Sequence, residues 1–234
     1  MKQLMTKIKQ SILNRCAFIF KKRLLGIRPP HVDFVEPNYY IINNFDENSV
    51  IVDIGTGYNA DFSQDMILKY HLKCYGFDPT RKHAAPLKII ESQSDGKFIY
   101  KPLALSSKEG VAEFHESEDN VSGSFSLDHV NVKRDRINSY TVKVVTIESL
   151  FKILSVNFIS LIKMDVEGEE YSIINSLPKS VADKIGQFII EFHHHCIDKY
   201  SIFNTLNAVK KMSSLGFVHY SEDGINYLFY RKNE

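Results

Sequence analysis

The stretch Ser49-Val-Ile-Val-Asp-Ile-Gly-Thr-Gly57 contains a short apolar run that ends at a pair of glycines. Uninterrupted β-branched residues are typical of a strand that is buried on both faces, as in a parallel sheet. The pattern predicts a strand over residues 49–53 and a tight turn at Gly55 and Gly57. A helix is predicted next, over residues 61–70, so the segment has the strand–turn–helix order of an α/β fold.

The rest of the chain continues this alternation. We predict further strands over residues 74–78, 98–104, 111–114, 141–145, 158–165 and 187–191, and helices over residues 37–44, 83–92, 147–154, 169–177 and 201–215. A hairpin is expected at the end, with strands over residues 217–220 and 227–230 around a turn at Asp223-Gly224. The chain is therefore predicted to have a Rossmann-like α/β fold. Its mostly parallel seven-stranded sheet would carry helices on both faces and a C-terminal antiparallel hairpin, as in class I methyltransferases.

The composition is that of an ordinary globular protein. The chain has 234 residues, of which 44% are hydrophobic and 24% are charged, with a net charge of +1. Its three cysteines, Cys16, Cys74 and Cys196, are far apart and include no CxxC pair. This argues against a disulfide framework or a zinc site built from cysteines, and it favours a cytoplasmic protein.

The basic residues are concentrated at the N-terminus. Residues 1–32 contain eight Lys and Arg and no acidic residue, which leaves 21 basic and 28 acidic residues in the rest. We therefore separate a basic, amphipathic helical segment (residues 1–32) from a domain with the predicted class I methyltransferase fold (residues 33–234), whose net negative charge disfavours nucleic-acid binding. The helix would pack on the domain or a partner subunit, or residues 1–28 would lie on the inner face of an anionic membrane. The oligomeric state is left open.

The glycine turn is also the predicted cofactor site. In an open parallel sheet, ligands bind at the carboxyl ends of the strands, where Asp53, Gly55, Gly57 and Asp78 are expected. The glycines let a ligand approach the backbone, and Asp78 can accept hydrogen bonds from the two hydroxyls of an adenosine ribose. The run from Gly55 to Ala60 also matches the G-x-G-x-x-A pattern of NAD sites. Asp53 favours S-adenosyl-L-methionine, because its carboxylate suits an ammonium group and repels a pyrophosphate; the alternative is that Asp53 is a structural cap for the turn.

A second motif is Ile162-Lys-Met-Asp-Val-Glu-Gly-Glu-Glu170, at the end of the predicted strand over residues 158–165. It resembles the K-x-D-x-E-G-x-E signature of the FkbM-type methyltransferases. Supporting matches are Ala104-Leu-Ser106, Val144-Val-Thr-Ile147 and Ile190-Glu-Phe-His193, and the resemblance covers residues 50–231. It implies an S-adenosylmethionine-dependent O-methyltransferase that acts on a hydroxyl of a sugar, glycan or related natural product. Ala104 is added to the expected cofactor site. In place of the family's further small residue after the glycines, this chain has Tyr58-Asn59.

Catalytic candidates lie at the ends of the predicted strands over residues 158–165 and 187–191. We expect Asp165 near the reacting methyl group, Glu167 to position the acceptor, and His193 to act as a general base. Lys163 would be either catalytic or a buried partner of a carboxylate, and His194 should point away from His193. A divalent metal held by Asp165, Glu191 and His193 is an alternative way to acidify the acceptor hydroxyl.

The segment over residues 116–128 is polar and rich in serine. We predict a loop here, which is either a lid over the acceptor or a surface connection. Two other functions also remain open: an NAD-dependent oxidoreductase or epimerase, and a binding module without catalysis. The clustered carboxylates between residues 163 and 170 disfavour the second, since an inactive site has no use for them.

Overall fold

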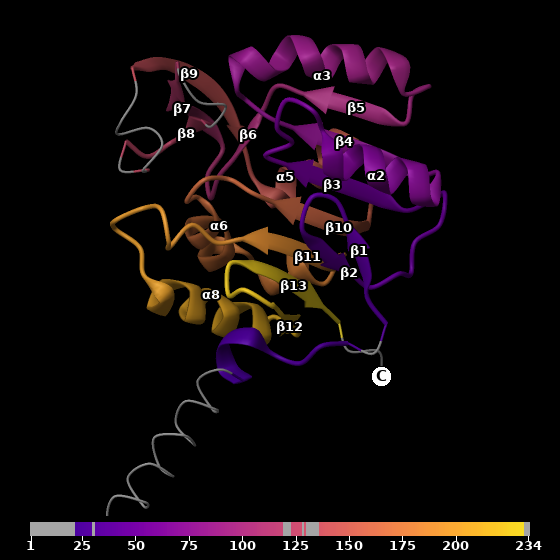
Figure 1. The fold of residues 1–234 in the computed structure, drawn as a ribbon, viewed down its shortest axis with the longest axis vertical. Helices are drawn as coiled ribbons and strands as arrows, with labels where there is room; N and C mark the ends of the chain where they lie inside the picture. Colours follow the sequence, from indigo (N-terminus) through magenta and orange to yellow (C-terminus); the bar gives the residue numbers. More distant parts are fainter. Residues whose placement is uncertain (1–21, 30, 119–122, 128, 130–135, 232–234) are drawn as a thin grey trace, which may run out of the picture.

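The computed structural model describes residues 22–29, 31–118, 123–127, 129 and 136–231. Within these residues a central sheet carries helices on both faces, and a smaller sheet lies beside one of its ends (Figure 1). The predicted α/β architecture is therefore confirmed, and the smaller sheet is an addition that the sequence did not indicate.

The central sheet has seven strands in the order β12-β13-β11-β10-β3-β4-β5. Their bounds are β3 Val50–Ile54, β4 Lys73–Phe77, β5 Phe98–Lys101, β10 Ile159–Met164, β11 Ile185–Glu191, β12 Val218–Tyr220 and β13 Asn226–Tyr230. Strands β5, β4, β3, β10 and β11 pair in parallel, whereas β13 is antiparallel to both of its neighbours. The mostly parallel sheet with a closing hairpin is thus confirmed. The strand order reverses between β3 and β10, which is where such folds bind ligands.

Two hydrophobic cores cover the two faces of the sheet. The helices are α2 Asp61–Tyr70, α3 Arg81–Gln93, α5 Ile147–Leu154, α6 Glu170–Ser176, α7 Lys179–Ala182 and α8 Ile202–Ser214. Helices α2 and α3 pack in one core, which contains Ile51 of β3, and α5 to α8 pack in the other, which contains Val52 and Ile54. Successive side chains of a strand point to opposite faces, so an apolar run is what a strand between two cores needs.

The predicted helix over residues 37–44 is wrong. A hairpin of β1 (Asp33–Val35) and β2 (Tyr39–Ile41) lies there, in the same core as α2. In β2 the first and third residues are buried and the middle one is half-buried, which is the two-residue period of a strand. Three residues are too few for this period to be recognised in the sequence.

The smaller sheet has the order β6-β9-β7-β8. It consists of β6 Ala104–Leu105, β7 Gly110–Ser117, β8 Gly123–Ser124 and β9 Ile137–Val145. The predicted strand over residues 98–104 is split by Pro102, which has no N–H to donate to a strand partner. The predicted loop over residues 116–128 is also partly wrong, because Glu116 and Ser117 end β7, and β8 pairs with His115 and Glu116. Residues 119–122 and 128 lie outside the described part of the chain.

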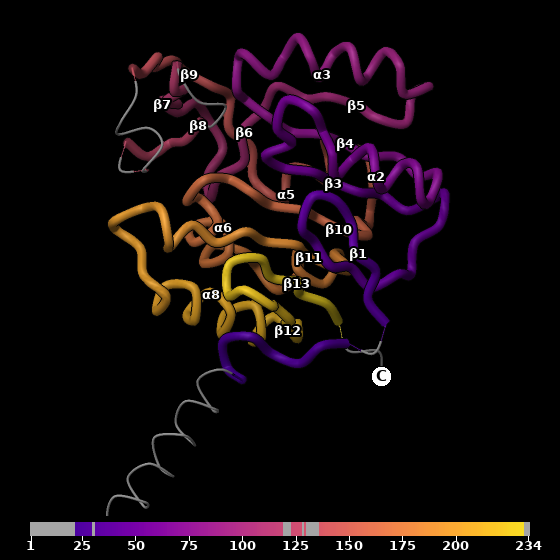
Figure 2. The backbone as a smooth tube through the Cα atoms, in the orientation of Figure 1, coloured from indigo at the N-terminus to yellow at the C-terminus, as the bar shows by residue number. Residues whose placement is uncertain are grey.

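The predicted amphipathic helix falls largely on residues 1–21, which lie outside the described residues. The described continuation forms one helical turn over residues 22–25 and then follows the edge strand β12 (Figure 2). The backbone N–H of Ile27 donates to His219 O at 3.2 Å, and that of Ser221 donates to Leu25 O at 2.9 Å. Among the described helices, none has the length and apolar character needed to cross a bilayer.

Gln187 of β11 attaches the N-terminal hairpin to the central sheet. Its side chain is 3% exposed; Nε2 donates to Ile42 O at 2.8 Å, and Oε1 accepts from Ile42 N at 2.9 Å. The substitution Gln187→Met keeps the volume but leaves both backbone groups of Ile42 without this partner. We expect it to lower the free energy of unfolding by about 1–3 kcal/mol, measured by urea denaturation. The exposed Gln93→Met is the matched control. Equal stabilities of the two variants would contradict this role.

Candidate active site

A cavity of about 280 Å³ opens at the carboxyl ends of β3 and β4. Residues from the smaller sheet, Phe114 and Gly123, close its other side, in keeping with the position of that sheet in Figure 1. Of the predicted site residues, six line this cavity: Gly55, Gly57, Asp78, Ala104, Asp165 and Glu167. Asp53 and His193 are not among its lining residues.

The Gly55–Gly57 turn is tied to the strands on both sides of β3. Gly55 has a φ of +74°, and a Cβ atom on it would lie 1.7 Å from Asp165 O, so no other residue fits there. Its N–H donates to Phe77 O at 2.9 Å, on the neighbouring strand β4. Tyr58 and Asn59, which replace the small residue expected from the family resemblance, also line the cavity.

Asp78 connects the end of β4 to this turn. Its Oδ2 accepts from Gly57 N at 2.9 Å and lies 3.1 Å from His83 Nδ1, and its Oδ1 accepts from Thr80 N at 2.9 Å. A carboxylate offers about four acceptor positions, so about one is left for a ligand. The sequence suggested an Asp78 that accepts both ribose hydroxyls; the structure leaves room for a contact to only one, unless His83 moves.

Asp53 is fully buried behind the turn. Ser63 Oγ of α2 donates to its Oδ2 at 2.7 Å, and Lys163 Nζ lies 3.4 Å from its Oδ1. Burial raises the pKa of Asp53, and the Lys163 ammonium partly offsets this effect. The predicted direct contact of Asp53 with an ammonium group of the cofactor therefore has no support in its position. Its charge already has a partner within the protein.

Lys163 of β10 is the partner that the sequence left uncertain. Its ammonium is buried, donates to Gly55 O at 2.7 Å, and lies 3.6 Å from Asp165 Oδ2. Burial alone would lower the pKa of Lys163, but the acidic groups around it, Tyr39, Asp53 and Asp165, outweigh burial and raise this pKa. Lys163 is thus a buried counterion, which confirms the structural alternative.

Asp165, Glu167 and His193 come together at the ends of β10 and β11. His193 Nε2 lies 3.4 Å from Asp165 Oδ1 and 3.3 Å from Glu167 Oε2. On its other side, His193 Nδ1 lies 3.2 Å from Glu170 Oε1 of α6, a carboxylate that is fully buried. The three predicted catalytic residues are therefore neighbours, and Glu170 is a fourth member that the sequence did not single out.

The surroundings of His193 do not suit the predicted general base. Burial disfavours its charged form, but hydrogen bonds to Asp165 and Glu170 outweigh burial and raise the pKa of His193 well above its usual value. Lys163 and His193 in turn overcome the effect of burial on Asp165 and lower its pKa to about 2. A raised pKa favours the protonated imidazole, which donates hydrogen bonds and is a poor proton acceptor. In this arrangement His193 is a hydrogen-bond donor to the carboxylates.

The predicted metal-ligand set is also changed. Among the described residues, one set of side chains close enough to share an ion is Asp165, Glu167 and His193, so in this set Glu167 takes the place predicted for Glu191. Glu191 accepts a 3.5 Å hydrogen bond from Tyr39 OH, and burial, followed by the charge of Asp165, raises its pKa to about 7.

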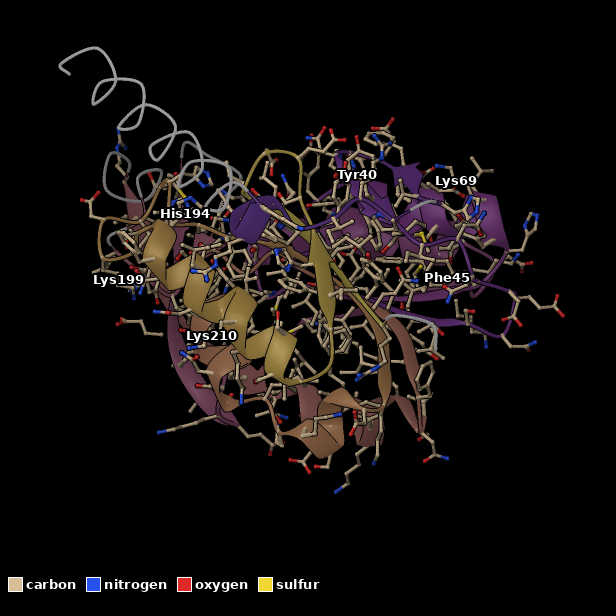
Figure 3. The ribbon with its side chains drawn as sticks, turned by 90° about the horizontal axis from the view of Figure 1, so that it is seen from below. Tyr40, Phe45, Lys69, His194, Lys199 and Lys210 are labelled. Carbon is tan, nitrogen blue, oxygen red and sulfur yellow. The ribbon has the colours of Figure 1, made fainter. Side chains whose placement is uncertain are left out.

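Two functional candidates were missed altogether. His129 Nε2 lies 2.6 Å from Glu167 Oε2 and 3.4 Å from Cys196 Sγ. Burial opposes the charged form of His129, but the hydrogen bonds to Cys196 and Glu167 raise its pKa to about 9. Neither residue stands in a motif, and no sequence signal joins positions so far apart. The expectation for His194 assumed that the strand continues, but β11 ends at Glu191; the Nδ1 of His194 (labelled in Figure 3) lies 2.9 Å from Thr205 Oγ1 of α8.

The fold and the site together define a class I methyltransferase: the strand order, the closing hairpin and a cavity beside the glycine turn all match. The model of the methyltransferase FkbM domain matches residues 34–218 of the chain, which is well over half of it. The protein therefore belongs to the FkbM methyltransferase family. No curated protein matches it in sequence.

Several solved structures have a similar chain path. Fibrillarin, a pre-rRNA processing protein of Methanococcus jannaschii, aligns with a TM-score of 0.48 and 10% identity over 81% of this chain and 69% of its own. An rRNA methylase of Streptococcus thermophilus aligns at 0.45 and 12% identity, over 80% and 89% of the two chains. Precorrin-6y C5,15-methyltransferase of Geobacter metallireducens aligns at 0.43 and 7% identity, over 80% and 82%. At such low identities these likenesses concern the fold alone.

The buried ion pairs of Lys163 generate a prediction about stability. The substitution Lys163→Met leaves Asp53 and Asp165 without their shared cation. We expect a loss of about 3–5 kcal/mol in the free energy of unfolding, measured by urea denaturation, because an uncompensated buried charge is costly. Adding Asp53→Asn to Lys163→Met should recover part of the loss.

The exposed Lys152→Met of α5 is the matched control. A Lys163→Met protein as stable as this control would rule out Lys163 as the ion that holds the two strand ends together.

Proposed function

We propose that the protein transfers a methyl group from S-adenosyl-L-methionine to a hydroxyl of a sugar, glycan or related natural product. The observation that carries the proposal is that Gly57 and Asp78 line the same cavity as Asp165 and Glu167. The first pair belongs to the turn that favours a nucleoside ligand, and the second pair belongs to the family signature. One cavity therefore offers a donor side and an acidic acceptor side.

The charge of the cavity favours this donor over NAD. Three carboxylates line it, those of Asp78, Asp165 and Glu167, and the described residues contribute no Lys or Arg side chain to its wall. Asp61 adds a further negative charge in the first turn of α2. A pyrophosphate would be repelled there, whereas a sulfonium and an ammonium group would be attracted. This argument replaces the one based on Asp53, whose charge is already paired.

The donor would be held by backbone and apolar contacts together with Asp78. Gly55 and Gly57 expose backbone to the cavity, and Phe77 and Leu103 give it apolar walls that suit a purine ring. The remaining acceptor position of Asp78 suits one ribose hydroxyl. When bound, S-adenosyl-L-methionine supplies an electrophilic methyl group on a positively charged sulfur.

On the acceptor side, Asp165 and Glu167 would orient the reacting hydroxyl. Asp165 is ionised at neutral pH, because its pKa is lowered to about 2, so it accepts hydrogen bonds and is a weak base. Fixing an oxygen in line with a leaving group contributes much of the rate in such a displacement. Phe114 and Phe125 of the opposite wall supply apolar surface against which a sugar ring or polyketide can pack.

A nucleic-acid acceptor is disfavoured by the same charges. The acidic cavity belongs to a domain in which acidic residues outnumber basic ones, and both features repel a phosphate backbone. A neutral polyol meets no such repulsion. The acceptor class itself rests on the resemblance of residues 162–170 to the family signature.

The donor is tested by calorimetry with S-adenosylhomocysteine and, separately, with NAD. We expect binding of the first only. The variant Asp78→Asn should weaken it roughly 10- to 150-fold, the equivalent of about 1.5–3 kcal/mol for a hydrogen bond to a charged group. Asp95→Asn, an exposed position on another loop, is the matched control. Binding of NAD alone would overturn the proposal in favour of an oxidoreductase or epimerase.

The acceptor class is tested with donor that carries a tritiated methyl group, offered with neutral sugars, glycans, polyketide alcohols and RNA. We expect label in the sugar or alcohol fraction, in a form that survives mild alkali, because methyl ethers resist it and methyl esters do not. Label that is released by alkali would contradict the proposed O-methylation, and label recovered in RNA would contradict the proposed acceptor class. S-Adenosylhomocysteine binding without transfer to any acceptor would favour a binding module.

A further inference from the structure

We infer that His129, Glu167, His193 and Cys196 form a binding site for a transition metal of the zinc type on the acceptor side of the cavity. This inference goes beyond the proposed methyl transfer, and metal binding can be measured without it. The four side chains come from three separate segments of the chain, which approach one another at the ends of β10 and β11.

The donor atoms are grouped around Glu167. His129, Glu167 and Cys196 form one set, and Asp165, Glu167 and His193 form the other; within each set the donor atoms lie within 4.8 Å of one another. Glu167 belongs to both sets, so one ion beside its carboxylate could take ligands from each. The imidazoles are sequestered, with side-chain exposures of 2% for His129 and 4% for His193.

Two of the donor spacings are those of a tetrahedral site, and the two sets would have to close together for one ion to bind all four donors. Metal–ligand bonds of about 2.0–2.3 Å place neighbouring donors roughly 3.3–3.7 Å apart. His193 Nε2 lies 3.3 Å from Glu167 Oε2, and Cys196 Sγ lies 3.4 Å from His129 Nε2. The distance from His129 Nε2 to Glu167 Oε2 is shorter, at 2.6 Å, as for a hydrogen bond. Rotation of the Glu167 side chain, which is 23% exposed, can open that distance.

The types of donor atom select the kind of metal. Two imidazole nitrogens, one sulfur and one carboxylate oxygen are ligands that Zn²⁺ and similar ions prefer. Mg²⁺ and Ca²⁺ favour sites made of oxygen atoms, so a thiol and two imidazoles argue against them.

A buried carboxylate orients one of the proposed ligands. Glu170 Oε1 lies 3.2 Å from His193 Nδ1 and also accepts from the His193 backbone N–H at 2.9 Å. Its other oxygen accepts from Gly168 N at 2.9 Å, so the carboxylate is fixed from two sides. Holding Nδ1 of a histidine by a carboxylate leaves Nε2 to face the ion, which is the usual outer-shell arrangement in metal sites.

The backbone places Glu167 between the two sets at a conformational cost. Its φ is +51°, in the left-handed region that residues with a side chain rarely adopt. Gly168 follows with a φ of +108°, and a Cβ atom there would lie 2.5 Å from Ile197 Cδ1, close to Cys196 in the chain. The strained turn thus brings Glu167 both to the cavity wall and to the segment that carries Cys196. Of the four proposed ligands, Glu167 is the one that lines the cavity, so its carboxylate would be the link between the ion and an acceptor hydroxyl.

The test uses the full chain, stripped with a chelator and titrated with Zn²⁺, and with Co²⁺ as a spectroscopic probe. We expect one equivalent of either ion per chain and a cobalt–thiolate charge-transfer absorption. Cys196→Ser should abolish this absorption, and His129→Ala should weaken Zn²⁺ binding. Glu170→Gln, which acts through His193, should weaken it about 10- to 100-fold.

His195→Ala and Cys16→Ser are the matched controls, and both should bind metal as the unchanged protein does. Failure of the unchanged protein to bind either ion more tightly than about 10 μM would overturn the inference. Zn²⁺ binding by the Cys196→Ser and His129→Ala variants that is as tight as that of the unchanged protein would also overturn the inference. So would a protein that binds only Mg²⁺. A cooperative urea transition like that of the unchanged protein shows that each variant is folded. If the protein binds Zn²⁺ at this site but does not bind S-adenosylhomocysteine, the proposed function is overturned and the metal site is not.

Discussion

The buried ammonium of Lys163 is the interaction on which the rest of the site depends. It joins the end of β3, through Asp53 and Gly55 O, to the end of β10, through Asp165. An ion in this position must be matched by charge, since an unpaired charge in the interior costs several kcal/mol. Asp53 therefore serves the fold, because its charge is paired with Lys163 behind the turn. Gly55 and Asp165 lie in front of this pair and line the cavity. The same contacts of Lys163 hold Gly55 close to Asp165 O.

From Asp165 the network continues through His193 to the carboxylates of Glu167 and Glu170. Each cation in it is buried, and each lies behind the wall that Asp165 and Glu167 present to the cavity. The arrangement sorts the charges, with positive groups inside the protein and negative groups at the surface of the cavity. That order explains why a cationic ligand, a donor sulfonium or a metal ion, suits the site and an anionic cofactor does not.

Local signals in the sequence predicted the regular elements well. The helix over residues 147–154 has the predicted bounds, because its apolar spacing and the Thr146 cap act within a few residues. The hairpin over residues 33–41 was missed because its strands are too short to show a period, and it is held by Gln187, far away in the sequence. The residues of the site show the same difference between local signals and long-range contacts. Residues at strand ends were found by position, whereas the joining of His129 to Cys196 and the pairing of Asp53 with Lys163 depend on contacts between distant segments.

The acidity of the cavity also bears on turnover in the proposed reaction. The sulfur of the donor carries a positive charge before transfer and none afterwards, so carboxylates nearby attract the donor more strongly than the product. Asp165 keeps its charge throughout, because Lys163 and His193 hold its pKa at about 2. The ion pairs of Lys163 that stabilise the fold thus also maintain the negative charge of the cavity, and this charge distinguishes the donor from its product. A neutral residue at position 165 would preserve the shape of the cavity and weaken this distinction, which Asp78 and Glu167 would then maintain alone.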